Sequence, residues 1–172
     1  MTCFLAAGDH IDAHYVADAR QNLLVLQRTR EEMKAYLEHV KEAELETDDE
    51  TKLQFWKDCC EEVLKMEQFV DETPFIQFKN TAEKCHGNNS PVFAKSVHLY
   101  AEYLYNLYSA SEDTVKLSLA KELCESAIAV NRGNNDELAL ADVLELYASV
   151  LSAIHNKVND EVDNANLCLS IE

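Results

Sequence analysis

Apolar residues recur every three or four positions along most of the chain, which is the spacing of α-helices that bury one side. The first such stretch covers residues 9–46. Its apolar positions follow steps of three and four, with Arg30 at one position of the series: Val16, Ala19, Leu23, Leu26, then Met33, Leu37 and Val40. We expect one long helix here, whose narrow seam either packs along the rest of the chain or joins two copies of it through residues 16–40.

Helix-starting signals divide the remainder of the sequence. The expected starts are a capping-box spacing at Thr47 and Glu50, a proline in the first turn at Thr73-Pro74 and at Ser90-Pro91, and caps at Ser111–Thr114 and at Asp136. They predict three antiparallel helical hairpins, over residues 51–86, 90–131 and 135–171. In the last hairpin, the first helix is expected to end at about His155 and the second to begin at Asn159 or Asp160.

A short phrase of the sequence occurs twice. Leu99-Tyr100-Ala101 returns 47 residues later as Leu146-Tyr147-Ala148, and a Gly-Asn-Asn sequence precedes each copy. A period of this length in a helical sequence is typical of stacked helical hairpins, in which each hairpin covers the apolar face of its neighbour. Such stacks are usually binding surfaces, so an interaction protein is favoured over an enzyme.

Composition supports a single all-α domain over residues 1–172. Hydrophobic residues make up 47% of the chain, which is enough to bury a core at this length. Only three glycines and two prolines occur, which are too few for the turns of a β-sandwich. We therefore expect a long N-terminal helix followed by three hairpins.

The chain is strongly acidic. It has 32 Asp and Glu against 15 Lys and Arg, a net charge of −17. The excess is spread along the chain, because residues 1–90 hold 19 acidic and 10 basic residues and the rest hold 13 and 5. Direct binding to nucleic acid or to an anionic membrane is disfavoured, since both need a basic face. A basic protein partner is compatible with this charge, although solubility alone also accounts for it.

No catalytic or metal site is expected. The glycine-rich phosphate-binding motifs and the G-x-S-x-G motif are absent from the sequence. His10 and His14 have the spacing of two ligands on one helix, but two ligands do not complete a metal site. Cys85 and His86 are adjacent and point apart on a helix, so they do not form a nucleophile and base pair. We expect no enzyme activity and no cofactor.

Cysteine usage indicates a reducing compartment. The cysteines lie at positions 3, 59, 60, 85, 124 and 168, without any C-x-x-C pair, and no signal peptide or membrane span is recognisable. Reduced thiols in the nucleus or the cytoplasm are the expectation.

The hairpins resemble tetratricopeptide (TPR) repeats. Small residues stand where the helices of such repeats touch: Ala101, Ala148, the spacing Ala120-x3-Cys124-x2-Ala127, and more weakly Ala165 with Leu169. The stretch from Ala101 to Ala120 is longer than a regular 34-residue repeat permits, and no proline closes a hairpin. The resemblance implies a short, irregular α-solenoid.

One subgroup with interrupted repeats is similar, namely the NASP-type histone chaperones. The similarity rests on three stretches: Phe78 to Ala82, Ser96 to Ala101, and Asp136 to Ala139 with Val143 to Ala148. The long acidic insertion of that family is absent, and only residues 109–116 stand in its place. The resemblance implies binding of histone H3 or of H3–H4.

In such a stack, the first helix of each hairpin lines the groove. The side chains expected to bind the partner are His98, Glu102, Tyr105, Asp142, Glu145 and Ser149. The carboxylates would pair with Lys or Arg, and Tyr105 would add an aromatic contact. Two alternatives remain open: a TPR-like adaptor for a non-histone peptide, and a self-associating helical bundle.

Overall fold

The computed structural model describes residues 30–66 and 71–169, with side chains as far as Asn159. The expected positions His10, His14, Val16, Ala19, Leu23 and Leu26 lie outside the described residues, as does most of the predicted seam between two copies. All described secondary structure is helical. Residues 30–45 form one helix, and α2 (Asp49–Lys65), α3 (Thr73–His86), α4 (Pro91–Ser111), α5 (Thr114–Asn134) and α6 (Glu137–Leu169) follow. The all-α prediction is confirmed for this part of the chain.

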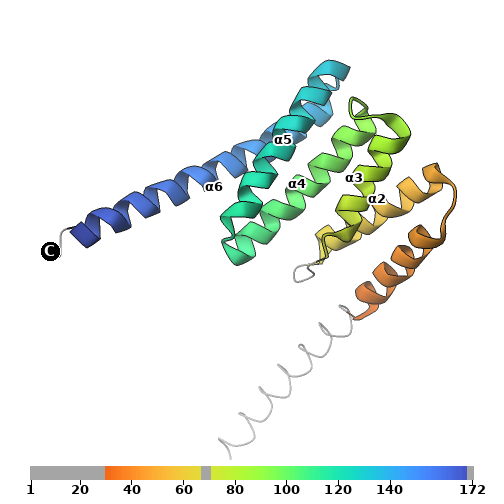
Figure 1. Ribbon diagram of the computed structural model, residues 1–172, viewed down its shortest axis with the longest axis horizontal. Helices are drawn as coiled ribbons and strands as arrows, with labels where there is room; N and C mark the ends of the chain where they lie inside the picture. Colours follow the sequence, from red (N-terminus) through yellow and green to blue (C-terminus); the bar gives the residue numbers. More distant parts are fainter. Residues whose placement is uncertain (1–29, 67–70, 170–172) are drawn as a thin grey trace, which may run out of the picture.

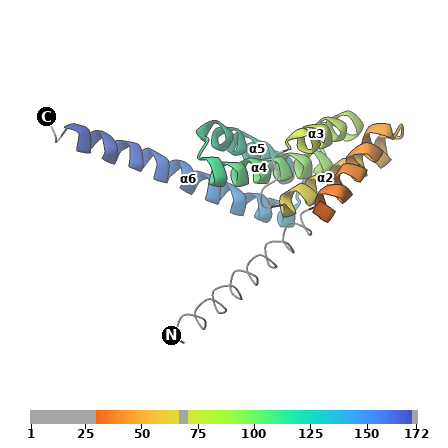
Figure 2. The same ribbon diagram turned by 90° about the horizontal axis from the view of Figure 1, so that it is seen from below.

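Successive helices pack against one another in a row that runs from α2 to α6 (Figure 1). α4 lies at the centre and contacts α2, α3, α5 and α6. Seen from below, α3 and α5 lie on one side of α4, and α2 and α6 on the other (Figure 2). α6 continues well past the other helices at the C-terminal end (Figures 1 and 2).

The core is apolar and aromatic, and α4 supplies its middle. Phe75 of α3 stacks on Tyr103 of α4, with ring centroids 4.3 Å apart. Ala101, Ala120, Cys124 and Ala127 are fully buried. These small residues allow α4 and α5 to approach closely, as their spacing predicts.

Local signals in the sequence explain most of the helix starts. The hydroxyl of Ser90 accepts a hydrogen bond from the backbone N–H of Phe93, and Asp113 caps α5 in the same way through Val115. Proline stands in the first turn of α3 and of α4, where its missing N–H costs nothing. The predicted capping box at Thr47 is wrong by one residue, because Asp48 is the N-cap and accepts from Thr51.

The prediction of a third hairpin is wrong. α6 is one continuous helix through the expected break between His155 and Asn159. Asn and Asp are only slightly unfavourable inside a helix, and neither glycine nor proline follows Asn134 to stop it. Residues 135–171 therefore contain no second helix that could fold back within the described range.

The helix at residues 30–45 packs through a face that includes two members of the predicted seam. Met33 and Val40 pack against the core, together with the buried Tyr36 and Ala43. Leu37, the third member within the described residues, is 48% exposed. The buried line is therefore 33, 36, 40 and 43, and Tyr36 takes the place that was expected for Leu37.

The second Leu-Tyr-Ala phrase does not repeat the role of the first. Leu99, Tyr100 and Ala101 are buried in α4, whereas Ala148 is exposed on α6. The expectation that Ala148 forms a close helix contact is wrong within the described structure. The physical reason is the missing break, because the helix that would pack on Ala148 is the straight continuation of α6.

Candidate partner-binding groove

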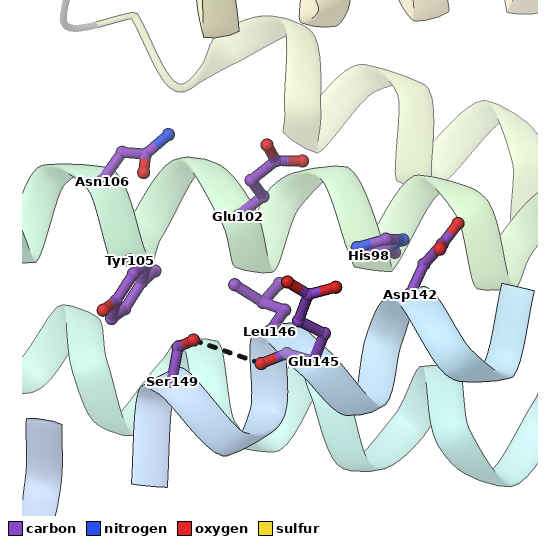
Figure 3. Close-up of a pocket in the computed structure, with 8 residues that line it drawn as sticks. All are labelled: His98, Glu102, Tyr105, Asn106, Asp142, Glu145, Leu146 and Ser149. Atoms are coloured by element: carbon purple, nitrogen blue, oxygen red, sulfur yellow. Dashed lines mark hydrogen bonds between the residues drawn. The ribbon is translucent and has the colours of Figure 1, made fainter. Parts of the chain in front are cut away.

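A groove of about 380 Å³ lies between α4 and α6. One wall comes from α4 and the other from α6 (Figure 3). Tyr105 is turned toward α6 and the Glu145 carboxylate toward α4, whereas the side chains of Glu102 and Asn106 extend from α4 away from α6 (Figure 3). The lining residues are His98, Glu102, Tyr105, Asn106, Asp142, Glu145, Leu146 and Ser149.

The helical period explains why these side chains converge. Residues three or four apart lie on one face of a helix, so 98, 102 and 105 share a face of α4, and 142, 145 and 149 share a face of α6. The neighbouring positions fix the orientation of each wall. Ala101 and Leu104 turn the other side of α4 into the core, and Val143 and Val150 do the same for α6.

The structure brings all six sequence-predicted side chains into this one groove. Two further lining residues, Asn106 and Leu146, were not predicted. Asn106 follows Glu102 by one helical turn, so the helical period alone would have predicted it on the same face. Leu146 belongs to the second Leu-Tyr-Ala sequence; it is partly buried against the core and also lines the groove.

The groove is negatively charged. Glu102, Asp142 and Glu145 line it, without any Lys or Arg among the lining residues. In the described part of the chain, none of these three carboxylates makes a hydrogen bond or an ion pair. The only bond drawn between lining residues joins the Ser149 hydroxyl, as donor, to the Glu145 backbone carbonyl over 3.2 Å (Figure 3).

Burial shifts two of the titratable groups in the groove. Burial raises the pKa of the Glu102 carboxyl, and nearby Lys95 only partly offsets it. Burial also lowers the pKa of His98, Lys95 lowers it further, and Asp142 opposes both. His98 is therefore neutral at pH 7, and the acidic character of the groove is not neutralised from within.

Two further hollows lie near the groove. Beyond Tyr105, a shallow hollow of about 440 Å³ includes Ser152 and Asn156. A hollow of about 440 Å³ between α2, α3 and α4 is lined by the apolar side chains of Leu53, Phe78, Pro91 and Val92. Its charged lining residues are of both signs: Lys57 and Lys95, with Glu50, which pairs with His86.

The four described thiols outside the groove are free. Cys59, Cys60 and Cys124 are buried, and burial raises the pKa of Cys59 to about 12 and that of Cys124 to about 11. Such thiols stay protonated and unreactive at neutral pH. Among the described residues, no group of three His, Cys, Asp or Glu side chains is arranged to hold a metal ion.

Comparison of the chain with protein-family models, with curated proteins and with solved structures gave no match. The groove must therefore be interpreted from its own chemistry. Carboxylates without partners, a phenol ring and a neutral imidazole bind cationic side chains well.

Proposed function

We propose that the groove between α4 and α6 binds a lysine- or arginine-rich segment of a partner protein. One observation carries this proposal: three carboxylates without partners among the described residues share a single groove that no Lys or Arg lines. A cationic side chain that enters the groove would gain charge-assisted hydrogen bonds from these carboxylates, of which Glu102 is partly buried and Asp142 and Glu145 are exposed. The net charge of −17 would speed the encounter with a basic partner.

Histone H3, alone or with H4, is the concrete partner to test. The resemblance to NASP-type chaperones favours it, and the row of paired helices is compatible with a TPR-like stack. This function places the protein in the nucleus, the cytoplasm or both, with neither nucleic acid nor a membrane as a direct ligand.

The test is a titration of the full chain with a fluorescent H3-derived basic peptide. Reversing the charge of the groove in the double variant Glu102→Lys/Glu145→Lys should abolish binding. The matched control, Glu83→Lys/Glu122→Lys, makes the same change in net charge at two exposed positions outside the groove and should retain most of it. Circular dichroism checks that the helicity of both variants is unchanged.

The dependence on salt gives a second readout. Binding through the carboxylates should weaken from low to moderate salt, because ions screen exposed charges. Equal binding by the groove variant and the wild type would refute the proposal.

A second candidate function is an adaptor for a peptide that is not basic. The apolar hollow beside Lys95 favours it, since the accessible side chains of Pro91 and Val92 would contact an apolar side chain of the peptide. Such binding would be nearly indifferent to salt, and a Val92→Ser substitution would weaken it while the groove variant would not. Circular dichroism checks that Val92→Ser keeps its helicity.

A further inference from the structure

α6 carries an apolar line that no other described helix covers. Leu144, Leu151 and Val158 are 39%, 40% and 52% exposed, and Ala141 and Ala148 between them are exposed as well. The line follows alternating steps of three and four residues, as in a coiled-coil seam. His155 is its one polar member.

This apolar line is distinct from the face of α6 in the core and from the face that lines the groove. Val143 and Val150 face the core, and Asp142, Glu145 and Ser149 face the groove. Within the described structure, α6 packs on α5 and touches α4, and the apolar line stays exposed. With respect to the described residues, a partner can therefore bind the line while the groove is occupied.

α6 is also long enough to serve as an interface by itself. Its 33 residues extend over about 50 Å. Its C-terminal part projects beyond the rest of the molecule, where another chain can approach it (Figures 1 and 2). In the sequence, the same spacing continues at Val162, Ala165 and Leu169.

The sizes of the residues favour a second copy of α6 in antiparallel orientation. From residue 141 to residue 151 small and large residues alternate along the line, with alanine at 141 and 148 and leucine at 144 and 151. In an antiparallel pair, Ala148 of one copy meets Leu151 of the other, Ala141 meets Val158, and Leu144 meets His155. Each alanine then leaves space for a larger residue, so the two surfaces interdigitate.

The charges along the line are compatible with self-association. Two chains of net charge −17 repel each other unless the contact itself is neutral. Between Ala148 and Val158, the flanking positions are Ser152 and Asn159 on one side and Tyr147 and Ile154 on the other, all uncharged. Along the line and its flanks, acidic residues occur only toward the two ends, at Glu137, Glu145 and Glu161. Glu145, which precedes Ser152 by one heptad, is directed into the groove.

We propose that two copies of the chain pair through the apolar line of α6, antiparallel, leaving both grooves open. This interface differs from the predicted seam at residues 16–40. By length and composition, residues Glu137–Asn159 would also suffice to cross a membrane. A membrane is the less favoured occupant, because the fully buried Val143 and Val150 would leave the core if α6 were inserted.

Sedimentation of the full chain over a wide range of concentrations tests this proposal. We expect the mass to double with concentration, and the variant Leu151→Glu to remain monomeric throughout. The matched control Asn156→Glu adds the same charge at an exposed position on another face of α6 and should still form dimers. If Leu151→Glu lowers the helicity, Val158→Glu replaces it at the more exposed end of the line.

Several results would overturn the proposal. These are a wild-type chain that is monomeric at every concentration, a Leu151→Glu variant that dimerises as the wild type does, and loss of the dimer in Leu37→Glu alone. Flotation of the wild type, but not of Leu151→Glu, with phosphatidylcholine vesicles would assign the line to a membrane instead. Because none of these measurements uses the groove, they are independent of peptide binding.

Discussion

The side-chain amide of Asn134 donates a hydrogen bond to the backbone carbonyl of Asn89 over 2.9 Å, which joins the end of α5 to the loop before α4. The same amide also donates to the carbonyl of Val130 over 2.9 Å. Asn89 and Asn134 belong to the two Gly-Asn-Asn sequences, so these two sequences contact each other in the fold. The two glycines nevertheless differ, because Gly87 has φ of 78° whereas Gly133 is inside α5.

Replacing each glycine by alanine should have opposite effects on stability. Gly133→Ala should raise the free energy of unfolding by roughly 0.5 kcal/mol, because alanine is the better helix former and its Cβ would meet no atom within 4 Å. Gly87→Ala should lower it by about 1 kcal/mol, because a Cβ strains a backbone with φ of 78° and ψ of 164°, which essentially only glycine adopts. Urea unfolding of the two variants measures both changes. Two changes of the same sign would contradict the assignment of Gly133 to the helix.

The ionised Glu102 carboxylate should lower the stability of the fold and strengthen the binding of a basic peptide. Since burial raises its pKa in the folded state, the folded chain binds this proton more tightly than the unfolded chain does. The resulting loss of stability is absent at acidic pH and develops as the pH rises through the folded-state pKa. Glu102→Gln should therefore be more stable than the wild type at neutral pH, by on the order of 0.5 kcal/mol, and should bind a basic peptide more weakly.

Thermal unfolding at neutral and acidic pH, together with a peptide titration, measures both effects of Glu102→Gln. The advantage in stability should vanish in acid. Glu122→Gln, at an exposed position of α5, is the control and should change neither quantity. A Glu102→Gln variant that is less stable at neutral pH would contradict the described burial.

Acid should weaken the binding of a basic peptide partly through His98. Its pKa lies below the usual value, so it is neutral at pH 7 and gains a positive charge among the carboxylates at lower pH. Between about pH 7.5 and about pH 5, this charge should reduce affinity by roughly threefold, as expected for one partly exposed charge. His98→Asn should lose that step, and His155→Asn on another face of α6 should keep it. Identical pH profiles for both variants would exclude His98 from the groove's response.

Two tyrosines of α4 should respond oppositely to removal of the hydroxyl. The Tyr103 hydroxyl is buried and has no hydrogen-bond partner among the described residues, whereas the Tyr100 hydroxyl donates to Glu72. Tyr103→Phe should leave stability unchanged or raise it by up to about 1 kcal/mol, and Tyr100→Phe should lower it by about 1 kcal/mol. Calorimetry of the two variants compares them. A large loss in Tyr103→Phe would indicate a partner for that hydroxyl.

The sequence predicts those features of the fold that neighbouring residues decide. Ser90-Pro91 marks the start of α4 because a cap and a proline act within one turn. The six groove residues come together because a helical period fixes which side chains share a face. Both predictions needed only local rules and the assumption that α4 and α6 lie side by side.

The misses have a different physical origin. The break expected at Asn159 depended on weak propensities, and the small preferences of Asn and Asp against helix do not end α6 there. Choosing between Tyr36 and Leu37 as the buried residue needs the position of α2, which no local pattern contains. Ala148 looked like a contact residue because it matched Ala101, but a match in sequence does not supply the neighbouring helix.

The two walls of the groove have different numbers of neighbours. α4 contacts four other helices, whereas α6 contacts mainly α5 and extends beyond it. We therefore expect the position of α6 relative to α4 to determine the width of the groove. A ligand that contacts both walls would restrict this movement, so that amide protons along α6 would exchange more slowly in the complex while those of α4 would hardly change.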